Sequence, residues 1–184
     1  MSDELGWHFT VGDVTAYDAR PIVVGETLRV KGKIIPCERG LHASPSVLDA
    51  LGYAPGPILW RVRLSGEVVP HGDPLDKWAA SERTALARID ATDILRAFAR
   101  QCASGVLHLW DAPQVVREFL AGDVSLWAAA RDAAAARDAA SWDAAWAAAR
   151  AAAWAAAWAA AGHAVWAKQR ERLEALCLAA IEGR

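Results

Sequence analysis

The chain has 184 residues, of which 54% are hydrophobic, and its formal net charge is -2 at pH 7. This size and hydrophobic content allow a buried core in one domain or two small ones, and the near-neutral charge gives no electrostatic reason to expect a nucleic-acid partner. The odd number of cysteines, three, argues for reduced thiols in a cytoplasmic protein and against a disulfide framework. The N-terminal residues MSDELGWHF lack the basic and apolar segments of a signal peptide, so we expect no export.

The first part of the chain, as far as Val69, has the pattern of a β-rich unit. Strands are predicted over Gly6–Val11, Thr27–Val30 and Ile58–Leu64, where apolar residues form short runs or alternate with polar ones. Between the second and third of these, Ser44 and Pro45 suit the start of a short helix that Gly52 ends.

The composition changes from His71 onwards. Asp73 or Asp76 is a candidate N-cap for a short helix through Trp78, and Thr84–Ile89 fits either a helix or a strand. Two amphipathic helices are then predicted, one over Asp93–Cys102 and one that opens at Ala112-Pro113 and stops at Gly122.

An alanine- and tryptophan-rich stretch, Trp127–Trp166, dominates the rest of the chain. Alanine is the strongest helix former, and the stretch holds no proline and a single glycine, so it predicts helix, with Ser141 and Gly162 as the best places for a break. Five of its tryptophans lie on one series of four-residue steps in which Arg150 and Gly162 take the skipped places: Trp142, Trp146, Trp154, Trp158 and Trp166. The series therefore winds around the helix, which suits either an array enclosed by other helices or a surface for a partner. The longest charge-free part, Ala151–Val165, is too short to span a bilayer.

The C-terminal residues return to ordinary amphipathic spacing and should pack back onto the body of the protein. The apolar face comprises Leu173, Leu176, Cys177, Ala180 and Ile181. We therefore expect an α+β fold: a small antiparallel β unit with one short helix over residues 1–72, and a helical bundle or hairpin over residues 73–184, with its long helices in residues 123–181.

One motif carries a family resemblance. Cys37, Gly40, Leu41 and His42 have the order cysteine, two residues, glycine, an aliphatic residue and histidine, and a strand ending in Gly-Glu-Val follows at Gly66. With these motifs, residues 25–69 resemble an uncharacterised domain of phage and bacterial proteins, a resemblance that brings no established activity. Residues 95–178 also resemble the alanine-rich helical repeats of immunity proteins of bacterial toxin systems.

A more distant resemblance gives the sharpest catalytic hypothesis. His8-Phe9-Thr10 is similar to the His-x-Ser/Thr element of ADP-ribosyltransferases of the poly-ADP-ribose polymerase kind, and Arg39–Ser44 is similar to the segment that stacks on nicotinamide. Arg61–Gly66 resembles the next strand of that family, and Glu82 its late glutamate.

This resemblance implies a role for each of four residues. His8 and Thr10 would bind the ribose and adenosine end of NAD, and His42 would support the nicotinamide. Glu82 would hold the ribose hydroxyl and stabilise the oxocarbenium ion, as a fixed carboxylate does in glycosyl transfer. The residues alone also allow a purely structural interpretation, in which His8 lies beside the core, His42 orients the Cys37 loop and Glu82 is a solvated charge.

Other kinds of site are weaker hypotheses. Cys37 and His42 offer a thiolate pair without a visible orienting acid, and together with His71 they lack the paired spacing of a zinc site, so no metal is expected. Several basic residues make the β part locally basic, which a solvated sheet face explains: Arg29, Lys31, Lys33, Arg39, Arg61 and Arg63.

Two functions remain open at this stage. The first is a non-enzymatic interaction or accessory protein of phage, mobile-element or immunity type, whose helical half binds a protein partner or self-associates, with no cofactor, no membrane and no nucleic acid. The alternative is an NAD-dependent ADP-ribosyltransferase-like enzyme with its cleft in the β-rich half. The enzyme requires His8, Thr10, His42 and Glu82 to meet at one cavity, whereas the binding protein does not.

Overall fold

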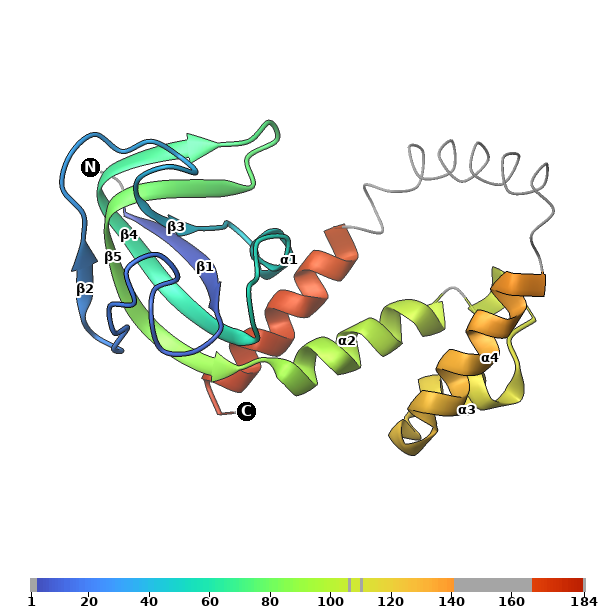
Figure 1. Ribbon diagram of the computed structural model, residues 1–184. Coiled ribbons are helices and arrows are strands. Elements are labelled where there is room, and N and C mark those ends of the chain that lie inside the picture. The colour runs from blue at the N-terminus through green and yellow to red at the C-terminus, as the bar shows by residue number, and fades with distance from the viewer. Residues whose placement is uncertain (1–2, 106, 110, 141–166, 184) are drawn as a thin grey trace. The chain divides into compact units, whose positions relative to one another are not determined.

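The computed structural model describes residues 3–105, 107–109, 111–140 and 167–183 (Figure 1). These residues form two compact units, one made of residues 1–94 with 170–184 and one of residues 95–169. A five-stranded antiparallel sheet accompanied by helices confirms the predicted α+β fold. Within the described residues, no helix is long and apolar enough to cross a membrane.

The sheet is built on a long hairpin of two strands. β4 (Ile58–His71) pairs with β5 (Lys77–Asp90) along its whole length, and register shifts interrupt the pairing after Arg61 and after Ser65. β1 (Glu4–Thr10) pairs with the first half of β4, while β2 (Thr27–Arg29) and β3 (Leu41–Ala43) both pair with β5.

The sheet curls so that β3 also meets β1. Trp7 and Ser44 exchange two backbone hydrogen bonds of 2.9 Å, which places the end of β3 beside β1 as well as beside β5 (Figure 1). The concave side holds a hydrophobic core, which comprises Ile22, Ala43, Ile58, Trp60, Val62, Leu64, Ala80 and Ala85.

The C-terminal helix, described over residues 167–181, belongs to the same unit as the sheet. Leu173 and Cys177 are fully buried, and the indole Nε1 of Trp7 donates to Glu174 Oε1 at 3.1 Å. Burial, with a smaller contribution from Glu174, raises the pKa of the Cys177 thiol to about 12. The predicted return of this amphipathic helix to the body is thus confirmed at Leu173 and Cys177.

The short helix α1 (Val47–Leu51) begins one turn after β3. Its N-cap is Ser46, whose hydroxyl accepts from the Asp49 N–H, and Gly52 follows its last residue as predicted. The start predicted at Ser44 and Pro45 is wrong, because the backbone of Ser44 pairs with Trp7 on β1. The Asp49 carboxylate also pairs with Arg170 at 2.7 Å, so α1 and the C-terminal helix are tied together.

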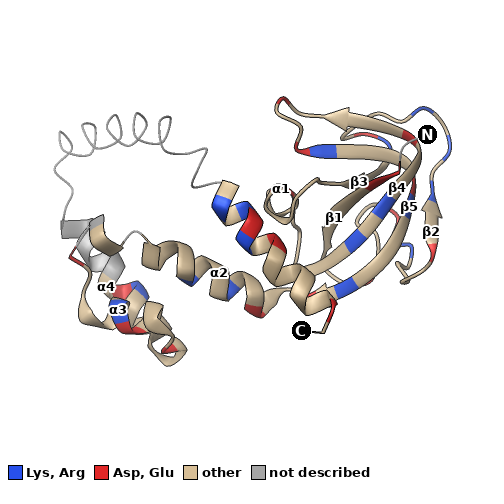
Figure 2. Cartoon of the chain, turned by 180° about the vertical axis from the view of Figure 1, so that it is seen from behind, with Lys and Arg blue, Asp and Glu red and all other residues tan. Residues whose placement is uncertain are grey.

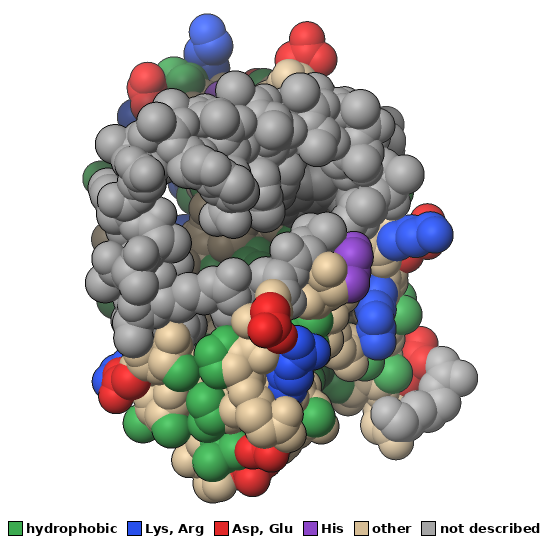
Figure 3. All heavy atoms as spheres, turned by 90° about the vertical axis from the view of Figure 1, so that its right-hand side faces the viewer, with side chains coloured by type: hydrophobic (Ala, Val, Ile, Leu, Met, Phe, Trp, Pro, Cys, Tyr) green, Lys and Arg blue, Asp and Glu red, His purple; other side chains and the backbone are tan. Residues whose placement is uncertain are grey.

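The second unit contains most of α2 (Thr92–Gly105) and all of α3 (Gln114–Ala121) and α4 (Trp127–Ala140). Short 3-10 turns lie between them, η1 (Leu107–Leu109) and η2 (Val124–Leu126). α3 ends at Gly122, as predicted, and Phe119 on α3 contacts Trp127 with ring centroids 5.6 Å apart. Hydrophobic side chains lie among charged ones over the described part of the face in Figure 3. The breaks predicted at Ser141 and Gly162, and most of the tryptophan series, fall outside the described residues.

One predicted element is wrong. The helix expected from Asp73 or Asp76 through Trp78 is instead the turn after β4 and the start of β5, and the strand continues through Thr84–Ile89, which fitted either state. Ala79 and Ala80 favour a helix by propensity, but both are fully buried between β3 and β4, and this packing outweighs propensity. The sheet therefore extends well past residue 72, the limit expected from composition.

Candidate functional site

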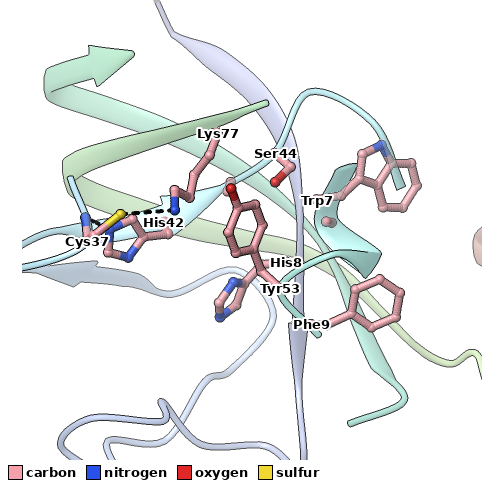
Figure 4. A pocket seen from close by; sticks show the side chains of 10 residues that line it. Trp7, His8, Phe9, Cys37, His42, Ser44, Tyr53 and Lys77 are labelled. Carbon is pink, nitrogen blue, oxygen red and sulfur yellow. Dashed lines mark hydrogen bonds between the residues drawn. The ribbon is translucent and has the colours of Figure 1, made fainter. Parts of the chain in front are cut away.

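Two neighbouring cavities open in the β-rich unit, and both are lined by His8, Cys37 and His42. The first has a volume of about 380 Å³ and is mostly apolar, with Tyr53 and the buried Lys77 at its polar end (Figure 4). The remaining lining residues are Trp7, Phe9, Ala43, Ser44 and Ala50.

The second cavity is larger, about 660 Å³, and markedly basic. Its wall contains two carboxylates, Asp18 and Glu38, against five permanent cations, which are Arg20, Arg29, Lys31, Arg39 and Arg83. Three of these were expected only to cover a solvated sheet face. Basic residues recur along β4 and β5 (Figure 2), but the cavity draws most of its cations from the loops around β2 and β3.

Arg83 is the unusual cation of this wall because it is buried. Only 4% of its surface is exposed, and its guanidinium donates to the backbone carbonyl of His42 at 2.8 Å. Burial, together with repulsion from Arg20, lowers the pKa of Arg83 from 12.5 to about 10. Among the described residues no carboxylate forms an ion pair with it, so a buried positive charge faces the cavity without a protein counter-charge.

His8 on β1 and His42 on β3 lie at the boundary between the two cavities. Burial, followed by the charges of Arg83 and His42, lowers the pKa of His8 well below 6.5. Burial also lowers the pKa of His42, with further contributions from Lys77, Arg83 and His71. Both rings are therefore neutral near pH 7. The neutral Nε2 of His42 accepts a hydrogen bond from the backbone N–H of Cys37 at 3.2 Å.

The Cys37 thiol is exposed and lies beside two basic side chains. Lys77 Nζ donates to its sulfur at 3.2 Å (Figure 4), and His71 Nε2 lies 3.8 Å from the same sulfur. The strand register explains this proximity, because His71 and Lys77 are paired across the β4–β5 hairpin and His42 is paired with Ala79 two residues further along β5. The loop that carries Cys37 then crosses the end of the hairpin.

Gly40 fixes this loop against the sheet. Its backbone has φ +149°, and a Cβ atom at this position would lie 3.0 Å from the Cβ of Ala79 and 3.2 Å from Ile34 Cγ2. A larger residue would therefore push the loop away from β5. Cys37 itself has φ 68°, a left-handed conformation that is uncommon for residues other than glycine. The spacing of cysteine, glycine and histidine in the motif thus has a physical basis: His42 holds the Cys37 backbone, and Gly40 allows the close approach.

Lys77 is buried, with 6% of its surface exposed, although it is a lysine. Its ammonium lies 3.9 Å from the centre of the Tyr53 ring, and the Tyr53 hydroxyl donates to Asp76. Burial acts to lower the pKa of Lys77, but the hydrogen bond to Cys37 and the charges of Cys37 and Tyr53 outweigh it, so the pKa is raised. The ammonium is therefore stabilised by a sulfur and an aromatic ring.

Of the four residues predicted to bind NAD, the structure brings two together. His8 and His42 share both cavities, whereas Thr10 is buried and its hydroxyl accepts from Trp60 Nε1 at 2.9 Å and donates to the Gly12 carbonyl. Glu82 lines neither cavity. Its carboxylate accepts from Arg29 at 3.1 Å and from the Ser65 hydroxyl at 3.2 Å. The four side chains do not meet at one cavity, which the transferase hypothesis required.

Sequence reasoning gave no site role to Lys77, Arg83 or Tyr53, and it considered His71 only as a zinc ligand. His71, Lys77 and Arg83 lie on β4 and β5, whose pairing brings them to the site, and Tyr53 lies in the turn after α1. No local motif marks any of them. Within the described residues, no group of three or more His, Cys, Asp and Glu side chains is arranged to hold a metal ion.

Comparison with known proteins gives one match. Residues 15–97 match the model of a domain of unknown function, DUF7666, which agrees with the resemblance to an uncharacterised domain. The matched region contains β2 to β5 and all lining residues of both cavities except those on β1. No curated protein and no solved structure matches the chain.

Proposed function

We propose that the β-rich unit is a binding module for a phosphorylated small molecule, held in the basic cavity beside His8 and His42. Arg83 is the observation that carries this proposal. A buried guanidinium without a counter-charge destabilises a fold, and a bound anion would remove that cost. Arginine is also the side chain best suited to hold phosphate through two parallel hydrogen bonds.

The rest of the wall supports a ligand of nucleotide size. The cavity of about 660 Å³ lies within the usual range of roughly 300 to 1,000 Å³ for small-molecule sites. Arg20, Arg29 and Arg39 surround it with further positive charge, and Tyr17, which is 99% exposed, offers a free aromatic ring at its edge. An exposed ring beside a cationic wall suits a ligand that has both a phosphate and a flat heterocycle.

The proposal is for binding without ADP-ribosyl transfer. NAD belongs to the ligand class that the cavity would accept, but transfer needs a carboxylate beside the ribose, and Glu82 lies outside both cavities. The interaction role of the helical half stays a separate prediction, because the tryptophan series on which it depends lies mostly outside the described residues.

Calorimetric titration with pyrophosphate, ATP and NAD tests the proposal. We expect binding of at least one of these probes to the full chain, and loss of that binding in Arg83→Met. Arg63→Met is a matched control, because Arg63 also lies in the sheet but lines neither cavity and pairs only loosely with Asp3, at 3.9 Å. No heat from any probe at millimolar concentration, or equal binding by Arg83→Met, would overturn it.

A further inference from the structure

Cys37 has the surroundings of a nucleophile, and this feature is independent of the anion site. Its sulfur is exposed, while the buried Lys77 ammonium donates to it at 3.2 Å. Positive charge beside the sulfur is a common feature of reactive cysteines, because the nucleophilic form of cysteine is an anion. Among the described residues no carboxylate forms an ion pair with Lys77, and its ammonium donates to the sulfur of Cys37.

His71 supplies a second requirement, a base. Its Nε2 lies 3.8 Å from the sulfur, which is within the range of a long hydrogen bond to sulfur. A thiol with an imidazole beside it is the arrangement that activates cysteine in acyl transfer. His42 cannot fill this role, because its Nε2 is already occupied by the Cys37 backbone N–H.

The backbone presents the sulfur at a fixed place. Cys37 has φ 68°, and residues held in this region often lie at functional sites, where the surrounding structure compensates for the strain. Here the compensation is visible: Ile35 and Arg39 exchange two backbone hydrogen bonds of 2.8 Å across the loop, and His42 holds the Cys37 N–H. The loop therefore keeps the thiol at the point that both cavities share.

The adjacent cavity indicates the class of substrate. Its wall is mostly apolar and includes Ala43, Ala50 and the ring of Tyr53, while Lys77 and His42 are at the Cys37 end (Figure 4). The side chains of Trp7 and Phe9 are buried and lie on the other side of β1 from His8 (Figure 4). A molecule with a small apolar body and an electrophilic carbon at one end would place that carbon beside the sulfur. An activated acyl compound, an ester or a thioester, has this form.

We propose that Cys37 and His71 form a nucleophilic pair that accepts an acyl group from an ester or thioester, with the apolar part of the acyl group in the cavity beside Tyr53, Ala43 and Ala50. His71 takes the thiol proton, and the sulfur attacks the carbonyl carbon. As the carbon–sulfur bond forms, the bond to the leaving oxygen or sulfur breaks, and His71 gives the proton to the leaving group. Water then hydrolyses the thioester, which releases the carboxylic acid and restores the thiol.

The test uses the full chain and p-nitrophenyl butyrate. We expect a rapid release of about one equivalent of p-nitrophenolate per chain, and a butyryl group on the peptide that contains Cys37 by mass spectrometry. A cysteine-containing peptide in the same solution is the reference for an ordinary thiol, and Cys37 should react at least about tenfold faster, which corresponds to about 1.4 kcal/mol in the barrier.

Five variants separate the parts of the proposal. Cys37→Ala should lose the rapid phase, whereas Cys102→Ser should keep it. His71→Asn and Lys77→Met should slow it about tenfold or more, and added imidazole should restore part of the rate to His71→Asn only. Arg63→Met, which lines neither cavity, should react like the unaltered chain. The assay contains no phosphate ligand, so failure of the phosphate proposal leaves this one standing. The inference is wrong if the label is found elsewhere, if Cys37→Ala keeps the rapid phase, or if Cys37 reacts no faster than the peptide.

Discussion

Replacing Arg83 with methionine should stabilise the β-rich unit while it abolishes anion binding. Burial and Arg20 lower the pKa of Arg83 from 12.5 to about 10, a difference that corresponds to about 3 kcal/mol of unfavourable free energy for the charged form in the folded state. Because 4% of the residue is exposed, solvent screens little of this cost. Methionine replaces the long aliphatic stem with a side chain of similar reach, so the packing is largely kept.

The substitution also has a cost. The hydrogen bond from Arg83 to the His42 carbonyl at 2.8 Å is lost, and the carbonyl left without its donor destabilises the fold by about 1 to 2 kcal/mol. The expected net effect is a gain of about 1 to 2 kcal/mol in the free energy of unfolding. This sign is the opposite of the usual effect of a substitution in a protein interior, which makes the experiment decisive.

Urea unfolding in a buffer without phosphate or sulfate measures this gain. Arg83→Met should have its midpoint at higher urea with the same slope, and Arg63→Met should differ from the unaltered chain by less than about 0.5 kcal/mol. Pyrophosphate should raise the midpoint of the unaltered chain and leave that of Arg83→Met unchanged. If Arg83→Met unfolds at lower urea than the unaltered chain without anions, the guanidinium already has a counter-charge, and the argument for an anion site fails.

Three further outcomes follow from the geometry. Burial and nearby cations lower the pKa values of His8 and His42 below 6.5, so the unfolded chain binds more protons than the folded chain as the pH falls. The free energy of unfolding should therefore decrease from pH 7 towards pH 5, by at most about 1.4 kcal/mol per pH unit for each histidine. Urea titrations measure this profile, and His8→Asn should flatten it. Leu173→Ala should lower the free energy of unfolding by about 2 to 5 kcal/mol in the same assay, because Leu173 is fully buried under the sheet unit. Glu82→Gln should not weaken phosphate-ligand binding in calorimetry, because Glu82 lines neither cavity and its loss only frees Arg29, which lines the basic cavity. A loss of binding would return Glu82 to the site.

Local pattern was sufficient to predict most of the elements. The alternation around Thr27 and the apolar run at Ile58–Leu64 mark β2 and β4, and Gly52 and Gly122 end their helices where the sequence places them. β5 could not be identified in the same way. Its first residues, from Lys77 to Ala80, include two alanines behind possible N-caps, a pattern typical of a helix, and only pairing with β3 and β4 makes them a strand.

Because β5 was assigned wrongly, half of the candidate site could not be predicted from the sequence. With residues 73–78 taken as helix, the sequence gives no reason to place Lys77 beside His71, although the two are cross-strand partners in the hairpin. Cys37 was therefore compared with His42, its neighbour in sequence, whose ring in fact holds the backbone. Glu82 and Arg83 show the complementary difficulty: adjacent residues on a strand point to opposite faces, so an error of one position moves a side chain out of the site.

The charged residues that are buried in the described part of the chain have the same sign. Lys77 and Arg83, 6% and 4% exposed, are the charged residues there that are buried as whole residues. One carboxylate oxygen of Asp76, the residue before Lys77, is buried as well and has no hydrogen-bond partner among the described residues. Lys77 lies against the apolar cavity and Arg83 against the basic cavity, and the two cavities share His8, Cys37 and His42. A structural role alone would favour burying each cation with a carboxylate or replacing it with an apolar residue, because either choice costs less. Here two cations without an ion-pair partner among the described residues lie near one thiol and two neutral imidazoles. This arrangement is expected where the negative charge comes from outside the chain, as a ligand phosphate, or arises during a reaction, as a thiolate.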